Sequence, residues 1–212
     1  REYDEDHFIF MATSSGTVKK TSLVNFSRQR AGGIIAVDLR GDDTLVDVAI
    51  TDGSNDIMLF ATTGKAIRFS EKDVRAMGRT ASGVRGIKLA DGHKVMSLIV
   101  VDDAASILTA TENGYGKRTA ADDYPCKGRG GQGVISIQAS ERNGTVIGAV
   151  QVKDSDQIML ITNGGILVRT SVDEVRVMGR NTQGVRLIRL TEGEKLVEIE
   201  QVESLGDEEE ND

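Results

Sequence analysis

The sequence predicts an all-β fold in which four blades of four strands each are arranged as in a propeller. Two observations lead to this prediction: four repeats of about 50 residues, and short apolar runs separated by glycine turns. Glycine is abundant, with 24 among 212 residues, whereas the chain has one proline and no tryptophan. Helical periodicity of useful length is absent, and the apolar runs are too short to cross a bilayer.

Two glycine positions keep nearly constant spacing through all four repeats. The first glycine lies in a predicted tight turn, and the second precedes the start of an apolar strand. The turn glycines are Gly16, Gly64, Gly114 and Gly165, at spacings of 48, 50 and 51 residues. The second set is Gly33, Gly83, Gly133 and Gly184, at spacings of 50, 50 and 51 residues. Because both glycine positions recur at nearly the same spacing four times, they indicate true structural repeats.

The first repeat predicts four short strands, at residues 8–12, 18–21, 34–37 and 44–50. A Ser15–Gly16 turn joins the first two, a longer loop leads to Gly33, and a turn at Gly41 precedes the last. Later repeats follow the same order and contain the hairpin dipeptides Asp91–Gly92, Asn113–Gly114 and Asn143–Gly144. Runs such as 146–150 do not alternate, which is typical of strands covered on both faces. We expect one domain, 1–202, with blades at about 7–54, 55–104, 105–154 and 155–202.

The net charge of −7 is concentrated at the two ends of the chain. Residues 203–212 carry six acids and no base, and residues 1–6 carry four acids and one base. Residues 7–202 carry 25 bases and 23 acids, a net charge of +2, so a polyanionic partner is not excluded. We expect the acidic tail, 203–212, to be disordered and to compete with a polyanion for the basic surface.

Catalytic and metal-binding patterns are weak in this sequence. A single cysteine, Cys126, excludes an internal disulfide and suits a reducing, cytoplasmic compartment. Two histidines do not make a zinc cluster, and the Asp52–Asp56 and Asp154–Asp156 segments lack a full calcium ligand set. We therefore expect no metal, no cofactor and no catalytic residue within this chain, and no membrane association.

Positive charge recurs at two places in each repeat. A base follows each turn glycine by four residues, and a second group of bases lies in the loop before the second glycine. One such residue is ordinarily a solvated charge at a strand edge, but repetition predicts a basic rim that binds duplex DNA through its phosphates. Glycines beside the loop bases let backbone N–H groups approach an anion. The candidate DNA-binding residues are Lys19, Lys20, Arg28, Arg30, Arg68, Arg75, Arg79, Lys117, Arg118, Lys127, Arg129, Arg169, Arg176 and Arg180.

Nearly all of residues 1–202 resembles the C-terminal DNA-wrapping domain found in the A subunit of bacterial DNA gyrase. The similarity is strongest in segments 3–7, 16–21, 113–119 and 179–185. The resemblance implies a propeller-like β-pinwheel that bends DNA around a basic outer rim. It also implies an A2B2 heterotetramer with the gyrase B subunit, in which ATP and magnesium bind to other domains and drive negative supercoiling. The family's catalytic tyrosine lies outside this chain.

The chain departs from the family in two respects. Family members usually have six blades, and their first blade contains a Gln-Arg-Arg-Gly-Gly-Lys-Gly box. Here four repeats are present, which we interpret as the last four of six. The nearest segment to the box is identical at four of seven positions and comprises Lys127, Gly128, Arg129, Gly130, Gly131, Gln132 and Gly133.

Two alternatives remain open. The first is the C-terminal domain of topoisomerase IV, which has a similar, reduced pinwheel in its own A subunit. The acidic tail and the four well-kept repeats favour gyrase over this alternative. A propeller scaffold for protein partners is the second alternative, but scarce aromatic residues and the repeated bases argue against it.

Overall fold

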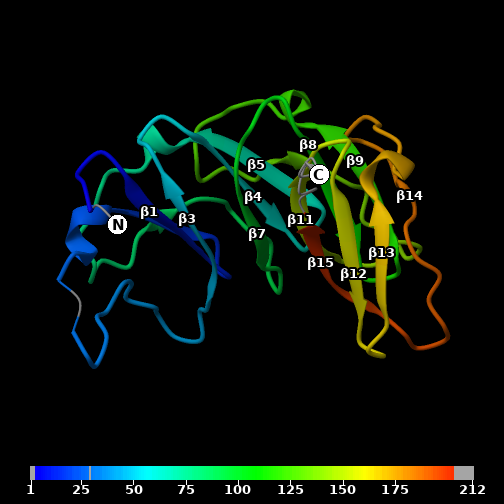
Figure 1. Cartoon of the computed structure of the whole chain (residues 1–212), viewed down its shortest axis with the longest axis horizontal. Helices are drawn as coiled ribbons and strands as arrows, with labels where there is room; N and C mark the ends of the chain where they lie inside the picture. The colour runs from blue at the N-terminus through cyan, green and yellow to red at the C-terminus, as the bar shows by residue number, and fades with distance from the viewer. Residues whose placement is uncertain (1–2, 29, 203–212) are drawn as a thin grey trace, which may run out of the picture. The chain divides into compact units, whose positions relative to one another are not determined.

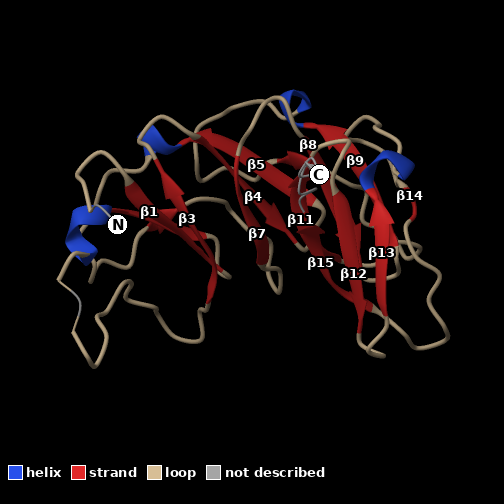
Figure 2. Cartoon of the chain, viewed as in Figure 1, coloured by secondary structure: helices blue, strands red, loops and turns tan. Residues whose placement is uncertain are grey.

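The computed structural model describes residues 3–28 and 30–202, and these residues fold almost entirely into strands and loops (Figure 2). The strands form three four-stranded sheets and one three-stranded sheet, and all strand pairs are antiparallel. The predicted all-β fold with four blade-like sheets is therefore confirmed. The acidic tail predicted at 203–212 lies outside the described residues.

The chain divides into two compact units, which are described separately. The first unit contains the described residues up to 102 together with 124–136 (Figure 1). Its sheets have the strand orders β3-β1-β2-β6 and β10-β5-β4-β7. The strands are β1 (Phe8–Thr13), β2 (Thr17–Ser22), β3 (Leu45–Thr51), β4 (Asp56–Ala61), β5 (Lys65–Ser70), β6 (Val84–Arg85), β7 (Val95–Val100) and β10 (Val134–Ile135). Two 3-10 turns follow the hairpins, η1 (Leu23–Phe26) and η2 (Glu71–Asp73).

The second unit contains residues 103–123 and the described residues from 137 onward. Its sheets have the strand orders β11-β8-β9-β14 and β13-β12-β15. The strands are β8 (Ser106–Thr111), β9 (Tyr115–Ala120), β11 (Val146–Val152), β12 (Gln157–Thr162), β13 (Leu167–Ser171), β14 (Val185–Arg186) and β15 (Leu196–Val202). The corresponding 3-10 turns are η3 (Ala121–Asp123) and η4 (Val172–Glu174).

Each four-stranded sheet takes its fourth strand from the following repeat. Val84 in β6 pairs with Val18 in β2, and the same exchange joins β10 to β5 and β14 to β9. The expectation that each repeat supplies all four strands of its own blade is therefore wrong. The second glycine of a repeat introduces a strand that belongs to the preceding sheet.

The strand expected at residues 34–37 does not form, and Ile35 is 63% exposed. In the other repeats, the strand after the second glycine pairs with the hairpin of the preceding repeat. Residues 34–37 have no such partner, because the described residues contain no hairpin before β1. The fourth sheet has three strands for the same reason. No described repeat follows β15 to place a strand beside β13.

The second glycine series is required by the exchange. Gly133 has φ of +73°, and a Cβ built there would lie 2.3 Å from the Ala66 carbonyl oxygen. Gly83 and Gly184 approach the backbones of Val18 and Gly116 in the same way. Only glycine combines a positive φ with so close an approach to another strand. The glycine spacing found in the sequence thus marks the points where one repeat joins the previous sheet.

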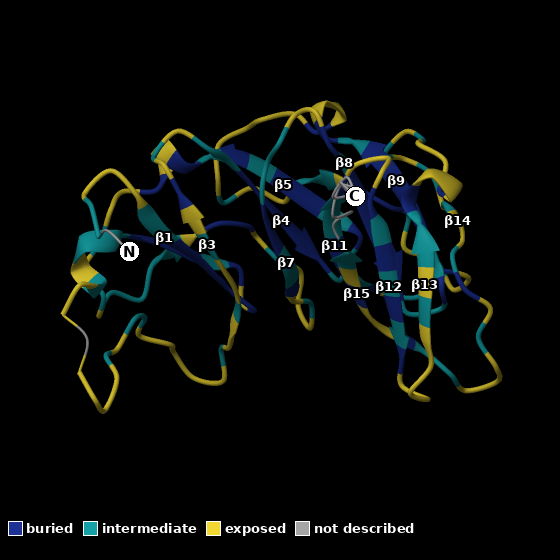
Figure 3. Ribbon diagram, viewed as in Figure 1, coloured by how far each residue is buried: buried dark blue, intermediate teal, exposed yellow. Residues whose placement is uncertain are grey.

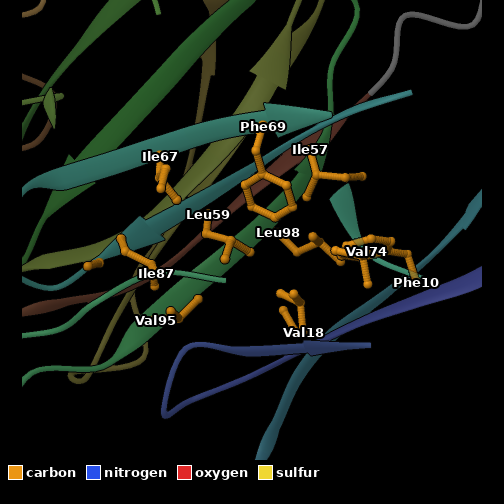
Figure 4. Close-up of a cluster of buried hydrophobic side chains, with 12 residues drawn as sticks. Phe10, Val18, Ile57, Leu59, Ile67, Phe69, Val74, Ile87, Val95 and Leu98 are labelled. Carbon is orange, nitrogen blue, oxygen red and sulfur yellow. The ribbon is translucent and has the colours of Figure 1, made fainter. Parts of the chain in front are cut away.

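The hydrophobic core of the first unit lies between its two sheets (Figure 4). Phe10 and Val18 from the first sheet pack with Ile57, Leu59 and Phe69 from the second, and all five are buried. Burial is consecutive along central strands such as β4 and β8, whereas many loops are exposed (Figure 3). The predicted two-sided burial is confirmed for these strands. The second unit has its own core, which includes Leu108, Ile158, Leu160, Val172 and Leu196.

Candidate nucleic-acid interface

Three basic loops follow the free edges of the hairpins, and we call them the edge loops: residues 75–85, 126–135 and 176–186. Each edge loop contacts its hairpin at both ends. The second one, for example, forms a parallel bridge between Cys126 and Arg68 and then an antiparallel pair between Val134 and Ala66. The sequence contains no aspartate or glutamate within any edge loop. The loop charge is therefore positive along each of these edges.

The bases that follow the turn glycines are directed inward in the first three sheets. Lys20 and Arg118 are each 6% exposed, and the side chain of Arg68 is 10% exposed. They form ion pairs of 3.4 Å for Lys20 with Glu71, 2.7 Å for Arg68 with Asp56, and 2.6 Å for Arg118 with Asp154.

The backbone at these three positions also holds the edge loops. The carbonyl oxygens of Lys20, Arg68 and Arg118 accept hydrogen bonds from the N–H groups of Met77, Lys127 and Met178, at 2.8, 2.9 and 2.8 Å. The repeated base therefore lies under the loop of the next repeat, where its side chain is enclosed. Arg169 has the same position in β13 but is exposed, since no described loop covers that edge.

Lys19 and Lys117 are buried as well, with 1% and 0% exposure. The Lys117 ammonium donates to the Gly179 carbonyl at 2.7 Å, to the Arg180 carbonyl, and to the Thr182 hydroxyl at 3.2 Å. Lys19 donates to the carbonyls of Ala36, at 2.5 Å, and of Arg79. Burial, reinforced by the nearby Arg79 and Arg180 charges, lowers the pKa of both lysines to about 8.

The surface placement predicted for five candidates is therefore corrected: Lys19, Lys20, Arg68, Lys117 and Arg118. Their cationic groups bind carboxylates or loop carbonyls of the protein itself, so they orient the edge loops and are not available to an external phosphate. Sequence position alone does not separate the two faces of a strand when both faces are covered.

The remaining candidates are accessible. Arg28, Arg30, Arg75, Lys127, Arg129, Arg169 and Arg176 are exposed, and Arg79 and Arg180 are partly exposed. Arg28, Arg30 and Arg79 line one hollow of about 390 Å³, so bases far apart in the sequence meet there. The Arg79 guanidinium donates to the Ile35 carbonyl at 2.8 Å, which fixes it beside that hollow.

The glycine-rich segment 127–133 has a structural role in the first unit. The Gly130 N–H donates to the Gly86 carbonyl at 2.6 Å, and the Gly131 carbonyl accepts from the Lys88 N–H at 2.8 Å. The Arg129 side chain is anchored through Nε to the Asp73 carbonyl at 2.8 Å and through Nη1 to the Arg85 carbonyl at 3.0 Å, yet Arg129 remains exposed. Lys127 and Arg129 are thus exposed on a segment whose backbone is fixed by hydrogen bonds to Gly86 and Lys88.

One arginine cluster was missed by the sequence analysis. Arg142 and Arg186 lie against the ring of Tyr115 in the second unit. Tyr115 directly follows a turn glycine, and Arg186 lies on the exchanged strand opposite it. If the sequence had revealed that β14 joins the preceding sheet, the glycine spacing would have predicted that Arg186 lies opposite Tyr115.

No group of three or more metal-binding side chains occurs within residues 3–28 and 30–202. Within the same ranges, no helix has the length and apolar character needed to span a bilayer. Cys126 is exposed as a residue, but partial desolvation of its thiol and the nearby Asp56 carboxylate raise the pKa of the thiol, which disfavours the reactive thiolate.

Comparison with known proteins identifies relatives of this chain. The DNA gyrase A subunit of Salmonella typhimurium is 60% identical over 212 residues, which is 100% of this chain and 24% of that protein. The DNA gyrase A subunit of Escherichia coli is 54% identical over 211 residues, again 100% of this chain and 24% of the relative. The chain thus spans about a quarter of the length of these curated relatives.

Two solved structures have the same fold. The crystal structure of the C-terminal domain of DNA topoisomerase IV matches with a TM-score of 0.90 and 28% identity, covering 96% of this chain and 64% of that one. The DNA gyrase A C-terminal domain matches with a TM-score of 0.83 and 25% identity, covering 94% and 67%.

The family model described as "DNA gyrase C-terminal domain, beta-propeller" matches four segments, 7–52, 55–102, 105–153 and 156–203. These segments follow the four repeats and include nearly the whole chain. The protein belongs to the family of DNA gyrase C-terminal β-propeller domains.

Proposed function

We propose that this chain binds duplex DNA through its phosphates and bends it, as the DNA-wrapping part of a gyrase A subunit. The observation that carries the proposal is the repetition of acid-free, basic edge loops on three successive sheets. Lysine and arginine side chains that neutralise phosphates release condensed counterions, which favours binding without sequence preference. The proposed contact residues are Arg28, Arg30, Arg75, Arg79, Lys127, Arg129, Arg169, Arg176 and Arg180.

The relatives are DNA gyrase A subunits, which supports the proposal that this chain acts as part of a gyrase complex. We place the chain in a cytoplasmic A2B2 complex with the gyrase B subunit, together with the rest of its own gyrase A polypeptide. In that complex, ATP and magnesium bind to other domains, and the bent DNA supports negative supercoiling.

A second candidate is the corresponding domain of topoisomerase IV, which the TM-score of 0.90 favours. The 60% identity to a gyrase A subunit over the whole chain favours gyrase more strongly. Supercoiling of relaxed plasmid by the full-length protein with its partner subunit separates the two, because the gyrase assignment requires net negative supercoils.

DNA binding is tested by measuring affinity for a 30-base-pair duplex over a salt series. If roughly four to eight phosphates are engaged, log affinity falls with log salt at a slope of about −4 to −7. A slope near zero, or a strong preference for one sequence, contradicts the proposal and favours the protein-scaffold alternative.

The contact residues are tested with a matched pair of variants. Lys127→Ala with Arg129→Ala removes two exposed edge-loop charges, and the slope becomes less steep by about two. Lys72→Ala with Lys94→Ala removes two exposed charges from outside the edge loops and leaves the slope near the wild-type value. Equal effects of the two pairs would show that only net charge matters, and that the edge loops are not the contact surface.

A further inference from the structure

The arginine cluster of the second unit surrounds an open hollow beside the start of β9. The hollow has a volume of about 620 Å³ and is lined by Tyr115, Arg142, Arg186, Leu187, Ile188 and Arg189. We call it the Tyr115 pocket. Its residues come from three places: the first residue of β9, the turn before β11, and the exchanged strand β14 with the residues after it. The pocket therefore exists only once the exchange has brought Arg186 opposite Tyr115.

Tyr115 holds two guanidinium groups. The Cζ of Arg142 lies 4.2 Å from the ring centroid, and the Cζ of Arg186 lies 5.5 Å from it. Arg186 Nη2 also donates to the Tyr115 hydroxyl at 3.0 Å, while Arg142 Nη1 donates to Gln183 Oε1 at 3.0 Å. A guanidinium close to an aromatic ring keeps its charge and loses side-chain freedom, so both groups are positioned before any ligand arrives.

The positive charge in the pocket is not neutralised by the protein. Within the described part of the chain, neither Arg142 nor Arg186 nor Arg189 forms an ion pair with a carboxylate. Each guanidinium has five N–H donors, and the contacts above use only a few of them. Three arginines around one open hollow thus retain many donors for an anion of matching geometry.

Equivalent hollows in the other sheets lack this character. The hollow beside the β2 turn is lined by two arginines, Arg40 and the exchanged Arg85, but also by two carboxylates, those of Asp38 and Asp43. The hollow beside the β5 turn has a volume of about 180 Å³ and contains lysines and no arginine. Among the three sheets that have an exchanged strand, the three-arginine hollow free of carboxylates is found at the third, so it does not follow from the repeat itself.

We propose that the Tyr115 pocket binds a backbone phosphate of duplex DNA, with Arg186 and Arg189 as phosphate contacts and Tyr115 as a positioning residue. Arginine binds phosphate oxygens through two parallel N–H donors, which suits a phosphodiester better than a point charge does. The pocket continues the edge loop 176–186, so DNA that follows Arg176 and Arg180 reaches Arg186 next along the chain. This assignment rests on the proposed DNA-binding function and adds a fixed contact to it.

The site is tested in the intact chain with the variant Arg186→Ala/Arg189→Ala, which removes the two proposed phosphate contacts. We expect roughly tenfold weaker binding of a 30-base-pair duplex at low salt and a salt slope less steep by about one to two. Arg186→Lys keeps the charge but loses the two-pronged donor, so the slope stays near wild type while affinity still falls. Unfolding temperatures of both variants establish that they are folded, and the Lys72→Ala/Lys94→Ala chain is the charge-matched control.

A direct readout is the NMR signal of the arginine Nε–H groups of Arg142, Arg186 and Arg189. We expect these signals to shift with the duplex and to remain unchanged with inorganic phosphate at the same phosphate concentration. Wild-type DNA binding with unshifted signals and an unaffected double variant overturns the pocket assignment alone. A response to inorganic phosphate but not to the duplex also overturns it, because the pocket then takes a free anion. Absence of any duplex binding by the wild-type chain overturns the proposed function together with this site.

Discussion

At the scale of single residues, the same basic position serves two purposes in this protein. Lys20, Arg68 and Arg118 are enclosed by an edge loop and paired with carboxylates, whereas the equivalent Arg169 is exposed. Both side chains are buried in the Lys20–Glu71 pair, so removing one of them leaves an uncompensated buried charge, which is strongly destabilising. A recurring base is therefore a surface residue only where no exchanged loop covers it.

A substitution of Lys117 tests most directly whether the buried bases stabilise the fold and the exposed ones do not. Lys117→Met keeps the length of the side chain but removes the ammonium that donates to Gly179, Arg180 and Thr182. We expect the free energy of unfolding to fall by about 1–3 kcal/mol, because loop carbonyls lose their donor. Lys127→Met, at an exposed position, should change it by less than about 0.5 kcal/mol. Chemical denaturation measures both values, and equal small changes would mean that Lys117 does not hold the loop.

The pH dependence of stability gives a second readout for Lys117. Its pKa falls from 10.5 to about 8 in the folded protein, so the unfolded chain binds more protons between these values. This residue therefore makes the free energy of unfolding rise with pH from about 8 to 10.5. Lys117→Met lacks this contribution, so its difference from the wild type widens over that window. A constant difference would mean that the lysine pKa is not lowered by folding.

At the scale of the elements, the exchanged strands depend on glycine. Gly33 and Gly133 have the same backbone conformation, with φ of +78° and +73°, but only Gly133 approaches another strand closely. Gly33→Ala should therefore lower the free energy of unfolding by about 1–2 kcal/mol, which is the strain of a left-handed backbone conformation alone. Gly133→Ala adds a clash with the Ala66 carbonyl and should cost a further 1–3 kcal/mol or so. Thermal unfolding of the two variants measures the difference, and equal losses would contradict the close approach.

The sequence predicted the repeats, the turns and most strands, because glycine spacing and apolar runs are local signals. It did not predict that Val84 pairs with Val18 of the previous repeat, since a two-residue strand carries no pattern that specifies its partner. It also did not predict the direction of Lys19 or Lys117. Both lie in strands with four consecutive buried residues, where alternation no longer distinguishes an inner from an outer face.

The sequence predicted the loop residues of the candidate interface but not the residues that strand exchange brings together. Arg75, Lys127 and Arg176 lie in loops, and the sequence correctly placed them as exposed. The Tyr115 pocket was missed because its residues come from two repeats that strand exchange brings together. Loop charges are visible in a sequence, whereas a cluster assembled by strand exchange requires the structure.

At the scale of the whole molecule, opposite charges are segregated. The acids at the two ends give the chain its net charge of −7, whereas residues 7–202 have a net charge of +2 and three edge loops without acids. Such segregation lets an acidic protein attract a polyanion locally, with an attraction that salt screens over about 10 Å. Bending a 20–30 base-pair site costs on the order of 1–6 kcal/mol, so contacts on several edge loops must act together to offset it.

The central claim is that the exposed bases of the edge loops bend DNA. The most direct test is energy transfer between dyes at the two ends of a 30-base-pair duplex, measured at low salt and with saturating protein. We expect the wild-type chain to shorten the end-to-end distance. A variant with Lys127, Arg129, Arg176 and Arg180 all replaced by alanine should leave bound DNA nearly straight, and the Lys72→Ala/Lys94→Ala control should bend it normally. Saturated binding by the wild type without any shortening, or equal shortening by the four-residue variant, would contradict the account.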